Sequence, residues 1–592
     1  MPLQLRWLTV LLLPVTVALP ARAQQSPLAQ VPDSPIVVHL RGWEHTVDRV
    51  KATLKASLPD YGELITGQID RAISDALNGR ELKGLAKEGP MFIVFTEVPT
   101  SSEETPDIAV MVRVTNYVQF RDAYLKEEER KDLKADKAGF ETASMGDKKM
   151  YWLNRGEYAV ITISEKSLKK FQDKKSATVE SRIAKPFAEK LLGADLSAFV
   201  DMKAVYKQHG DQMANARGFV DQAIQAAQGM GGVDKTQVEQ AKKILESVFQ
   251  LVEDTEQLVA SVDFRPEGFM LRTYVQVAEK SPSNDYLKTV KPAALSGIGK
   301  LPAGAMVYSN SSSNLELAQG LLSSMLGLGG GGGDAKSTKA AEGALAEMTG
   351  LKFEESYSSY DFPSGGINVI RYADPAKAVA ASLKLYQAIP ENAAFGGSAL
   401  KGKPEVKPNE QSVGGFSLHG VKLNWDIDRM VERFPEELRE GMKETMKKLL
   451  GHGQRIWFGT DGKAFVQVTA KDWTEGKKRL DEYLSGRATV GASAEFAATR
   501  KQLPAETNTL VLLDAGRMAH AIGQYIGEIL KNFPALPFNL GAAGKPEGKP
   551  SYIGFAMTLQ PRQGGIDLFL PAEAVKQIFT VLKPLFGGLD SE

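Results

Sequence analysis

A β-hairpin followed by a helix occurs twice in this sequence, about three hundred residues apart. The first copy spans Met150–Leu168, and the second begins at Arg455. In each copy, two runs of β-branched and aromatic residues are joined through a glycine-containing turn, which is typical of a hairpin. Aligned without a gap, Trp152 falls on Trp457, an offset of 457 − 152 = 305 residues. The repetition predicts an internal duplication.

Other segments extend the duplication over the rest of the chain. Asp201 follows a predicted strand and starts a helix, and Asp514 does the same in the second part of the sequence. Each part also closes with a predicted hairpin, and Pro561 lies in the turn where Pro266 lies in the first. Between these landmarks, strands such as the apolar run Met91–Phe95, which we expect to be central in its sheet, alternate with helices.

We therefore expect an α+β fold of two tandem duplicated halves, residues 34–292 and 293–592. Hairpins imply antiparallel pairing, so each half should be an antiparallel or mixed sheet with helices packed on it. Residues of about 327–340 are a predicted glycine-rich linker, and about 389–411 a predicted low-complexity loop. The groove between two halves packed side by side is the default position for a ligand.

The N-terminal segment has the features of a cleavable signal peptide. Arg6 supplies a positive charge, Trp7–Leu19 is apolar, and Ala21-Arg22-Ala23 is a small-residue cleavage site. The apolar part is too short for a membrane-spanning helix, which needs about 20 residues. We expect a signal peptide at 1–23, a flexible arm at 24–33, and a periplasmic or extracellular location.

Composition excludes several classes of protein. The chain has no cysteine, which excludes disulfides, thiolate chemistry and a cysteine-linked lipid anchor. Lys plus Arg equals Asp plus Glu at 72 each, so the sequence offers no electrostatic basis for binding nucleic acid. No later stretch of 18 uncharged apolar residues occurs, so we expect no transmembrane segment in the mature chain.

The order of these segments resembles exported bacterial proteins that share a duplicated domain of unknown function. The segments that carry the likeness are Lys300–Tyr308, Leu503–Asp514 and Val259–Val277, which are two Leu-Pro-Ala leaders to strands and a closing hairpin. The resemblance covers most of the mature chain. It implies no catalytic residue, because none is assigned in that family.

Histidines do not form a metal-binding motif. His39 and His45 flank a strand-to-helix junction with Glu44 between them, and no His-x-x-x-His or Glu-x-x-His spacing occurs. We interpret His39 as a hydrogen-bonded strand residue and place His209 and His452 beside glycines at a helix turn and in a loop. No metal site and no cofactor is predicted.

Two glycine-containing stretches fail as catalytic or phosphate-binding motifs. Gly329–Gly333 is followed by Asp334 and Ala335, which separate the glycines from the Lys-Ser that a phosphate loop needs next to them. The stretch Gly415–His419 has the wrong fifth residue for a nucleophile elbow and lies in a predicted hairpin.

The repeated residues have ordinary structural explanations. Asp201 and Asp514 are expected to cap helices, with paired acid–base chemistry as the alternative. Trp152 and Trp457 are expected to be buried on a sheet face, with a stacking platform for a ligand as the alternative.

The sequence therefore predicts an exported, soluble, non-catalytic binding or scaffolding protein, whose ligand is an unknown small molecule or envelope protein. Two alternatives stay open. A carrier of apolar molecules or lipid would have a deep cavity lined by Leu, Val, Phe and Met. A hydrolase with a site assembled from scattered residues would have clustered titratable groups with shifted pKa values. A scaffold would show an exposed apolar patch instead.

Overall fold

The computed structural model describes most of the chain. The described residues are 26–99, 106–146, 148–173, 175–229, 235–312, 340, 343–344, 346–348, 350–363, 365–395, 398–432, 434–451, 453–530, 544–546 and 548–583. The expected signal peptide at 1–23, residues 327–339 of the expected linker, and His452 lie outside the described residues.

Among the described residues, twenty strands form one continuous sheet, and two more form a small separate pair. The strands are β1 (Ile36–Leu40), β2 (Met91–Phe95), β3 (Ile108–Arg113), β4 (Lys134–Ala135), β5 (Glu141–Met145), β6 (Lys148–Arg155), β7 (Tyr158–Thr162), β8 (Leu196–Asp201), β9 (Thr255–Arg265), β10 (Gly268–Val277), β11 (Val307–Ser311), β12 (Phe353–Asp361), β13 (Gly365–Tyr372), β14 (Ala394–Phe395), β15 (Ser398–Ala399), β16 (Glu405–Val413), β17 (Phe416–Asn424), β18 (Gly453–Thr460), β19 (Phe465–Ala470), β20 (Thr509–Asp514), β21 (Tyr552–Gln560) and β22 (Gln563–Pro571).

Helices connect most of these strands and close the chain. They are α1 (Trp43–Ser57), α2 (Gly62–Leu77), α3 (Tyr117–Tyr124), α4 (Glu127–Lys131), α5 (Glu165–Gln172), α6 (Val179–Arg182), α7 (Lys185–Gly193), α8 (Met202–Gly229), α9 (Lys235–Asp254), α10 (Pro282–Leu287), α13 (Pro375–Ala388), α14 (Ile427–Val431), α15 (Glu436–Leu450), α16 (Trp473–Ser485), α17 (Ala494–Gln502), α18 (Ala515–Leu530) and α19 (Ala572–Leu582), with short 3-10 turns at η1 (Pro27–Gln30), η2 (Ser296–Lys300) and η3 (Val490–Ala492).

Backbone pairing gives the large sheet a regular order. From edge to edge the strands run β4-β5-β6-β7-β3-β2-β1-β8-β9-β10-β22-β21-β20-β11-β12-β13-β19-β18-β17-β16, and every neighbouring pair is antiparallel. The first ten strands come from residues 34–292 and the last ten from residues 293–592. The α+β class and the antiparallel pairing are confirmed, and β2 lies between β1 and β3, inside the sheet as expected.

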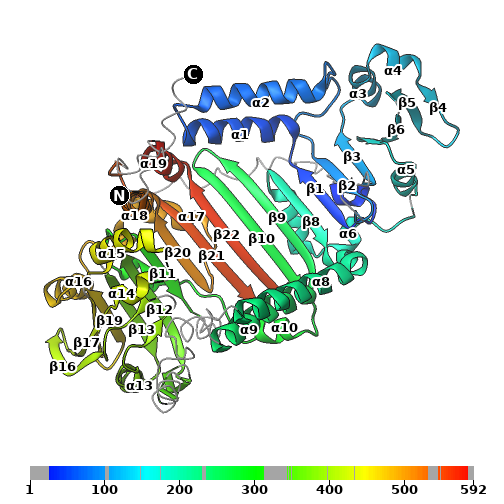
Figure 1. Ribbon diagram of the computed structural model, residues 1–592. Helices are drawn as coiled ribbons and strands as arrows, with labels where there is room; N and C mark the ends of the chain where they lie inside the picture. The colour runs from blue at the N-terminus through cyan, green and yellow to red at the C-terminus, as the bar shows by residue number, and fades with distance from the viewer. Residues whose placement is uncertain are drawn as a thin grey trace, which may run out of the picture.

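The two sequence ranges meet edge to edge at the centre of the sheet (Figure 1). β10 pairs with β22 from Gly268 opposite Pro571 to Gln276 opposite Gln563. The two ranges therefore do not pack as separate halves with a groove between them, as the sequence led us to expect. Backbone hydrogen bonds make them one sheet instead.

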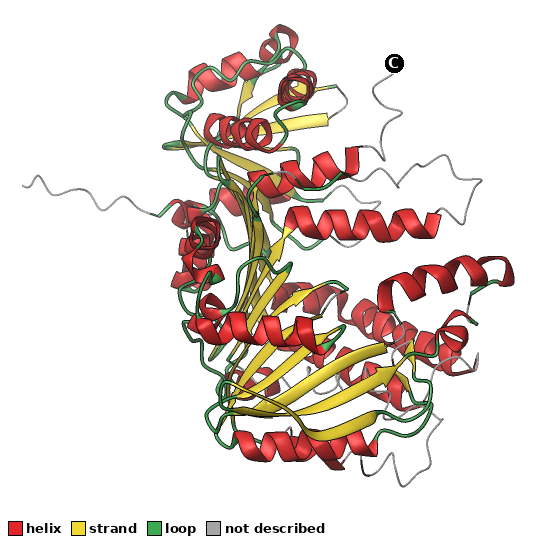
Figure 2. Ribbon diagram, turned by 90° about the vertical axis from the view of Figure 1, so that its left-hand side faces the viewer, coloured by secondary structure: helices red, strands yellow, loops and turns green. Residues whose placement is uncertain are grey.

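Helices cover the two faces of this sheet unequally. On one face, which we call the covered face, α5, α6 and α7 pack on the strands of residues 34–292, and α16 and α17 pack on those of residues 293–592. The opposite face carries α3 at one end and α13 at the other. Between those ends, the strands from β2 to β20 are left uncovered by the described helices, and we call this part the open face. Figure 2 shows the curved sheet edge-on, with helices close against one side.

Helical arms stand at the strand ends and border the open face (Figures 1 and 2). α1 and α2 follow β1, and they lie on the same rim as α18 and α19, with contacts between α1 and α19 and between α18 and α19. At the opposite rim, α8 and α9 connect β8 to β9. The result is a broad trough whose floor is the open face.

The expected flexible arm at 24–33 is wrong for its described residues. Residues 27–30 form η1, and both Leu28 and Val31 are completely buried. The backbone N–H of Asp33 donates to the carbonyl of Ala177 at 2.8 Å. The segment is polar overall, but its two apolar side chains fill the core beneath α6, and that burial outweighs the polar composition.

The expected low-complexity loop at about 389–411 is also wrong in part. Residues 405–413 form β16, which pairs with β17 at the outer edge of the sheet. The ladder is interrupted between Lys407 and Gln411, and Pro408 lies within this irregularity. Lysine and proline are tolerated, and even favoured, on an edge strand because its outer backbone groups need no partner strand.

Candidate functional site

The side chains of the open face are uncharged and predominantly apolar. Their accessibility is intermediate or high in every case, whereas their neighbours along the same strands point to the covered face and are mostly buried. Strand register assigns the following residues to the open face: Ile36, Val38, Leu40, Ile93, Phe95, Leu196, Ala198, Val200, Leu258, Ala260, Val262, Phe264, Phe269, Leu271, Thr273, Val275, Thr509, Val511, Leu513, Ile553, Phe555, Met557, Leu559, Ile566, Leu568 and Leu570.

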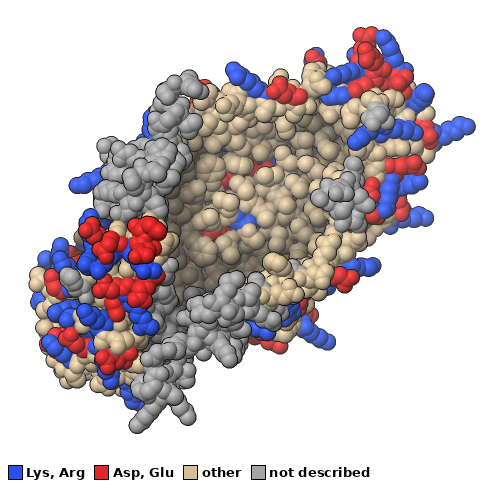
Figure 3. Space-filling model, in the orientation of Figure 1, with Lys and Arg blue, Asp and Glu red and all other residues tan. Residues whose placement is uncertain are grey.

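The centre of the open face is the most exposed part. Leu271 in β10 is 40% exposed and Ile566 in β22 is 44% exposed, whereas Met270, which points to the other face, is fully buried. Figure 3 shows this region as a wide hollow of almost entirely uncharged residues, with charged side chains gathered on the outer parts of the molecule.

The size of the open face exceeds that of an ordinary surface patch. Eight strands from β2 to β20 at about 4.8 Å spacing span roughly 34 Å, and three to four outward residues per strand span roughly 20 Å, which gives roughly 700 Å². The largest apolar patch on a typical soluble monomer is about 300–600 Å², and larger patches mark interaction sites. The open face is therefore the strongest candidate for the functional surface.

At the centre of the sheet, the charged residues of the same strands lie on the covered face. Asp263 accepts hydrogen bonds from Arg272 and from Arg265, the latter at 3.1 Å. Arg272 Nε also lies 3.4 Å from Asp567 Oδ1, which accepts a hydrogen bond from the Tyr274 hydroxyl at 2.9 Å. Burial pushes the pKa of Asp263 upward, but the contacts with Arg272 and Arg265 and the backbone N–H of Asp195 together outweigh it and hold that pKa below its usual value. Burial raises the pKa of Asp567.

Another buried carboxylate, that of Asp195, ties the rim helix α1 to the sheet. Asp195 is fully buried; its Oδ1 lies 3.1 Å from His45 Nε2, and its Oδ2 lies 3.3 Å from Arg49 Nε. The same carboxylate accepts the backbone N–H of Phe264 at 2.8 Å. This network positions α1 over the end of β9, so it is a structural joint.

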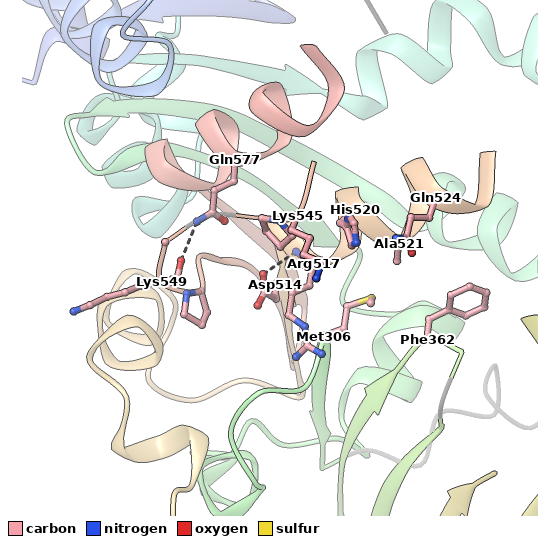
Figure 4. Close-up of a pocket in the computed structure, with 13 residues that line it drawn as sticks. Met306, Phe362, Asp514, Arg517, His520, Ala521, Gln524, Lys545, Lys549 and Gln577 are labelled. Carbon is pink, nitrogen blue, oxygen red and sulfur yellow. Dashed lines mark hydrogen bonds between the residues drawn. The ribbon is translucent and has the colours of Figure 1, made fainter. Parts of the chain in front are cut away.

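A pocket with a volume of about 490 Å³ lies at the rim, between α18, α19 and the start of β11 (Figure 4). Arg517 binds Asp361 at 3.1 Å, and Gln577 Nε2 donates to the carbonyl of Lys549 at 2.9 Å. Burial raises the pKa of Asp514 at the pocket wall. We call this the rim pocket; its lining residues are Met306, Phe362, Asp514, Arg517, His520, Ala521, Gln524, Lys545, Pro546, Gly548, Lys549, Pro550 and Gln577.

A smaller pocket of about 270 Å³ lies on the covered side beside α16. Its charged groups are engaged with one another: Arg479 pairs with Asp361 at 3.2 Å and with Glu475 at 2.8 Å. This pocket offers an ion-paired wall to a ligand.

The capping role expected of the two repeated aspartates is confirmed. Asp201 Oδ1 accepts the backbone N–H of Ala204 at 3.3 Å, and Asp514 Oδ1 accepts that of Arg517 at 3.1 Å. Asp201 also forms an ion pair with Arg182. The two carboxylates lie in different halves of the sheet, and the structure does not bring them together.

Both repeated tryptophans are buried, as expected, but the prediction that they occupy equivalent positions is wrong. Trp152 packs beneath α3 in a cluster with Val112, whereas Trp457 packs beneath α16 on the covered face with Ile367. The residue that shares a face with Trp152 is Phe458, at an offset of 306. Because side chains alternate along a strand, a one-residue difference in offset moves the tryptophan to the other face.

The described histidines are hydrogen-bonded and do not form a metal site. His39 Nδ1 lies 3.3 Å from Ser197 Oγ, and His209 Nε2 lies 2.7 Å from the carbonyl of Pro99. Among the described residues, no group of three or more His, Asp or Glu side chains is placed to hold a metal ion. Ser417 lies within β17, as expected for a hairpin rather than a nucleophile elbow.

Sequence reasoning named an exposed apolar patch only as one possibility and did not locate it on these strands, although a signal was present. Strands β1, β2 and β21 carry apolar residues at successive positions, so that both sides of each strand are apolar, which predicts burial on both faces. In the structure, only one of those faces is packed against helices. No pattern in a single sequence distinguishes a face that is buried within the chain from one that is covered by another molecule.

Within the part of the chain that is described, no helix has the length and apolar character needed to cross a membrane. Comparison with known proteins gives no relatives: no family model, no curated protein sequence and no solved structure matches this chain.

Proposed function

We propose that this protein is an exported, non-catalytic binding protein that carries an apolar molecule on its open face. An exposed apolar patch is also what a scaffold would show, and the hollowed shape of the open face is what favours the carrier. The observation that supports this most directly is the uncharged floor of the trough, where Leu271 and Ile566 are each more than a third exposed. The covered face of the same strands holds the buried carboxylates Asp263 and Asp567. Apolar side chains ordinarily take the interior and charged ones the surface, so an exposed apolar face opposite buried charges is unusual.

The shape of the trough favours an alkyl chain over a polar ligand. Burying each methylene group stabilises a complex by about 0.8 kcal/mol, so a long chain laid on apolar side chains gains affinity with every carbon it contacts. The open face is roughly 20 Å long along its strands. One leaflet of a bilayer provides roughly 15 Å of hydrocarbon, so a single lipid chain would fit within that length.

Non-catalytic function is proposed because neither of the two pockets brings a serine or threonine hydroxyl together with a histidine among its described lining residues. The rim pocket contains His520 but no hydroxyl or thiol side chain among its described lining residues, and the smaller pocket contains Ser359 but no histidine. The hydrolase alternative is therefore the weaker one.

Tandem duplication is proposed together with this function. Two features support it: the strand order, which reads equivalently from the two edges, and the closing hairpins, whose two-residue turns begin with Pro266 and Pro561. At that offset of 561 − 266 = 295, Arg272 corresponds to Asp567, and these two residues lie directly opposite each other in the β10–β22 pairing. Export by the segment 1–23 stays a proposal from the sequence.

Native mass spectrometry of the mature chain, purified from its own envelope without detergent, tests the carrier proposal. We expect an excess mass of a few hundred daltons that is extracted into organic solvent. In the double variant Leu271→Arg/Ile566→Arg, we expect the excess mass to be lost, because two charges would lie on the floor of the trough. Its melting temperature should stay close to that of the wild type, since both positions are exposed.

The matched control is Val118→Arg, on α3 and outside the open face, where the side chain is 52% exposed. It should keep the excess mass. A bare mass for the wild type, together with no binding of an apolar fluorescent probe, would rule the carrier out. Purification as a discrete complex with another protein would favour a scaffold.

A further inference from the structure

The side of the sheet that forms the open face continues past β20 as a polar but uncharged surface. In the strand register, Ser309 of β11 lies opposite Val511 of the open face, and Ser311 lies opposite Thr509. Residues directly opposite each other in an antiparallel pair point to the same side, and the same two rows extend over β12, β13 and β19. We call the polar residues of these rows beyond β20 the hydroxyl–amide patch; they are Ser309, Ser311, Ser356, Ser358, Asn368 and Gln467.

The side chains of the hydroxyl–amide patch are accessible, and several are linked to one another. All six are partly exposed. Ser309 Oγ lies 2.8 Å from Ser358 Oγ, and Ser356 Oγ donates to Asn368 Oδ1 at 3.2 Å. That bond uses an acceptor of Asn368 and keeps the two N–H groups of its amide as donors for another partner. The helix α13 packs beyond the patch, mainly on β18.

The two ends of this face differ in polarity. Under the proposed duplication, Asp201 corresponds to Asp514, an offset of 514 − 201 = 313, so Ala198 of β8 corresponds to Val511 of β20. The rows that run outward from these two residues read Ala198, Val38, Ile93, Val110 and Ile161 in the first part and Val511, Ser309, Ser358, Asn368 and Gln467 in the second. The first row is apolar throughout, whereas the second becomes polar beyond β20. The face therefore has the polarity of an amphiphile, with an apolar end and an uncharged polar end.

The chemistry of the hydroxyl–amide patch fits a group that both donates and accepts hydrogen bonds. Serine hydroxyls and the amides of Asn368 and Gln467 each combine donors with acceptors, as sugar hydroxyls do. A charged headgroup is bound best by charged partners, and none of the six residues carries a charge. An aromatic ring adjoins the patch: Tyr360 lies two residues after Ser358 in β12, on the same side, and is 39% exposed. A sugar ring has apolar C–H faces that pack on such a ring and polar edges that bond with hydroxyls and amides.

We propose that the hydroxyl–amide patch binds the uncharged sugar headgroup of a lipid whose alkyl chain lies on the open face. This inference rests on the proposed carrier function and specifies its ligand class. Asn368 and Gln467 exchange hydrogen bonds with the sugar hydroxyls, and Tyr360 packs against a C–H face of the sugar ring. The four strands from β11 to β19 span roughly 14 Å at about 4.8 Å spacing, which is wide enough for a small sugar headgroup.

Calorimetric titration of the delipidated full chain with three probes tests this assignment. The probes are dodecyl maltoside, a dodecyl poly(ethylene glycol) ether with the same alkyl chain, and maltose, with both amphiphiles kept below the concentration at which they form micelles. We expect dodecyl maltoside to bind about tenfold more tightly than the ether, because the sugar hydroxyls donate and accept hydrogen bonds whereas the ether oxygens only accept them. Maltose alone should bind far more weakly, because it cannot use the open face.

The variant Asn368→Leu/Gln467→Met should abolish the preference for dodecyl maltoside and leave binding of the ether unchanged, because it removes both amides and leaves the open face intact. The control Gln119→Met, on α3, removes an exposed amide outside the trough and should keep the preference. Tyr360→Leu should weaken dodecyl maltoside alone. The melting temperature of each variant shows whether it folds as the wild type does.

Each other outcome overturns a specific claim. Equal binding of the two amphiphiles that survives Asn368→Leu/Gln467→Met but is lost in Leu271→Arg/Ile566→Arg would refute the headgroup site and keep the carrier function. Maltose binding as tight as that of dodecyl maltoside would mean a sugar site that is independent of the open face. No binding of either amphiphile would refute the carrier function itself.

Discussion

At the scale of single residues, the central strands place charged side chains on the helix-covered face and apolar side chains on the exposed face, which is the reverse of an ordinary sheet. Asp263, Arg272 and Asp567 are directed into the covered face, where hydrogen bonds and ion pairs satisfy them. Breaking a buried pair by removing one partner is costly because the other charge stays buried. These contacts also connect β9 and β10 to β22, so they hold the two sequence ranges in one register.

His39 provides a test of burial at the residue scale. Burial lowers its pKa from 6.5 to about 4. Between those values the unfolded chain binds a proton that the folded chain excludes, so stability must fall as the pH is lowered from 6.5 to 4. At about 1.4 kcal/mol per pH unit, the expected contribution is about 3 kcal/mol. Urea denaturation across this pH range measures it.

His39→Gln is the comparison, since it removes the titration and keeps a side chain able to bond with Ser197. We expect the difference in unfolding free energy between wild type and variant to decrease as the pH falls. A pH-independent difference would show that the pKa of His39 is the same in the folded and the unfolded protein, as for a histidine exposed to solvent.

At the scale of elements, register decides what a strand presents to each side. The hairpins that contain Trp152 and Trp457 were predicted correctly, but the first closes with a two-residue turn and the second with a four-residue turn. The sequence patterns can be aligned without a gap even though the side chains at matching positions point to opposite faces. The hydrophobic pattern alone identifies the element, and backbone pairing determines which side of the sheet each side chain lies on.

Gly268 at the start of β10 tests the close approach of the two central strands. Its φ is +144°, and a Cβ at this position would lie 2.2 Å from the carbonyl oxygen of Leu570. We expect Gly268→Ala to lower the free energy of unfolding by roughly 2–4 kcal/mol, because the strain adds to a backbone clash that β22 can relieve only by shifting. Chemical denaturation measures the change.

Gly156 is the matched control for that experiment. It also has a positive φ, of +72°, but no atom lies within 4 Å of a Cβ built there. Gly156→Ala should therefore cost only about 1 kcal/mol, the conformational term alone. Equal effects of the two substitutions would argue against a tight β10–β22 junction.

At the scale of the whole molecule, one sheet joins ranges that the sequence suggests are separate. The junction consists of the β10–β22 pairing over nine residue pairs, supported by the ion pair between Arg272 and Asp567. Separating the ranges would leave two long strands with unpaired backbone groups, each next to an apolar face. Such edges are templates for association.

Expression of residues 26–292 and 293–592 as separate chains tests this reading of the junction. Each alone should aggregate or associate, whereas co-expression should give a soluble one-to-one complex that elutes at the size of the whole chain. Size-exclusion chromatography with light scattering distinguishes these states. Stable monomers of either piece would show that the halves are independent domains that merely touch.

The sequence by itself determined most elements, the α+β class, the antiparallel pairing and the caps at Asp201 and Asp514, because these depend on local pattern and turn chemistry. Only the tertiary structure decided that β10 and β22 merge two ranges into one sheet, that Leu28 and Val31 belong to the core, and that one apolar face stays open. Each of these depends on which distant segment covers a given side chain. Local periodicity records that a residue is apolar but contains no information about its partner.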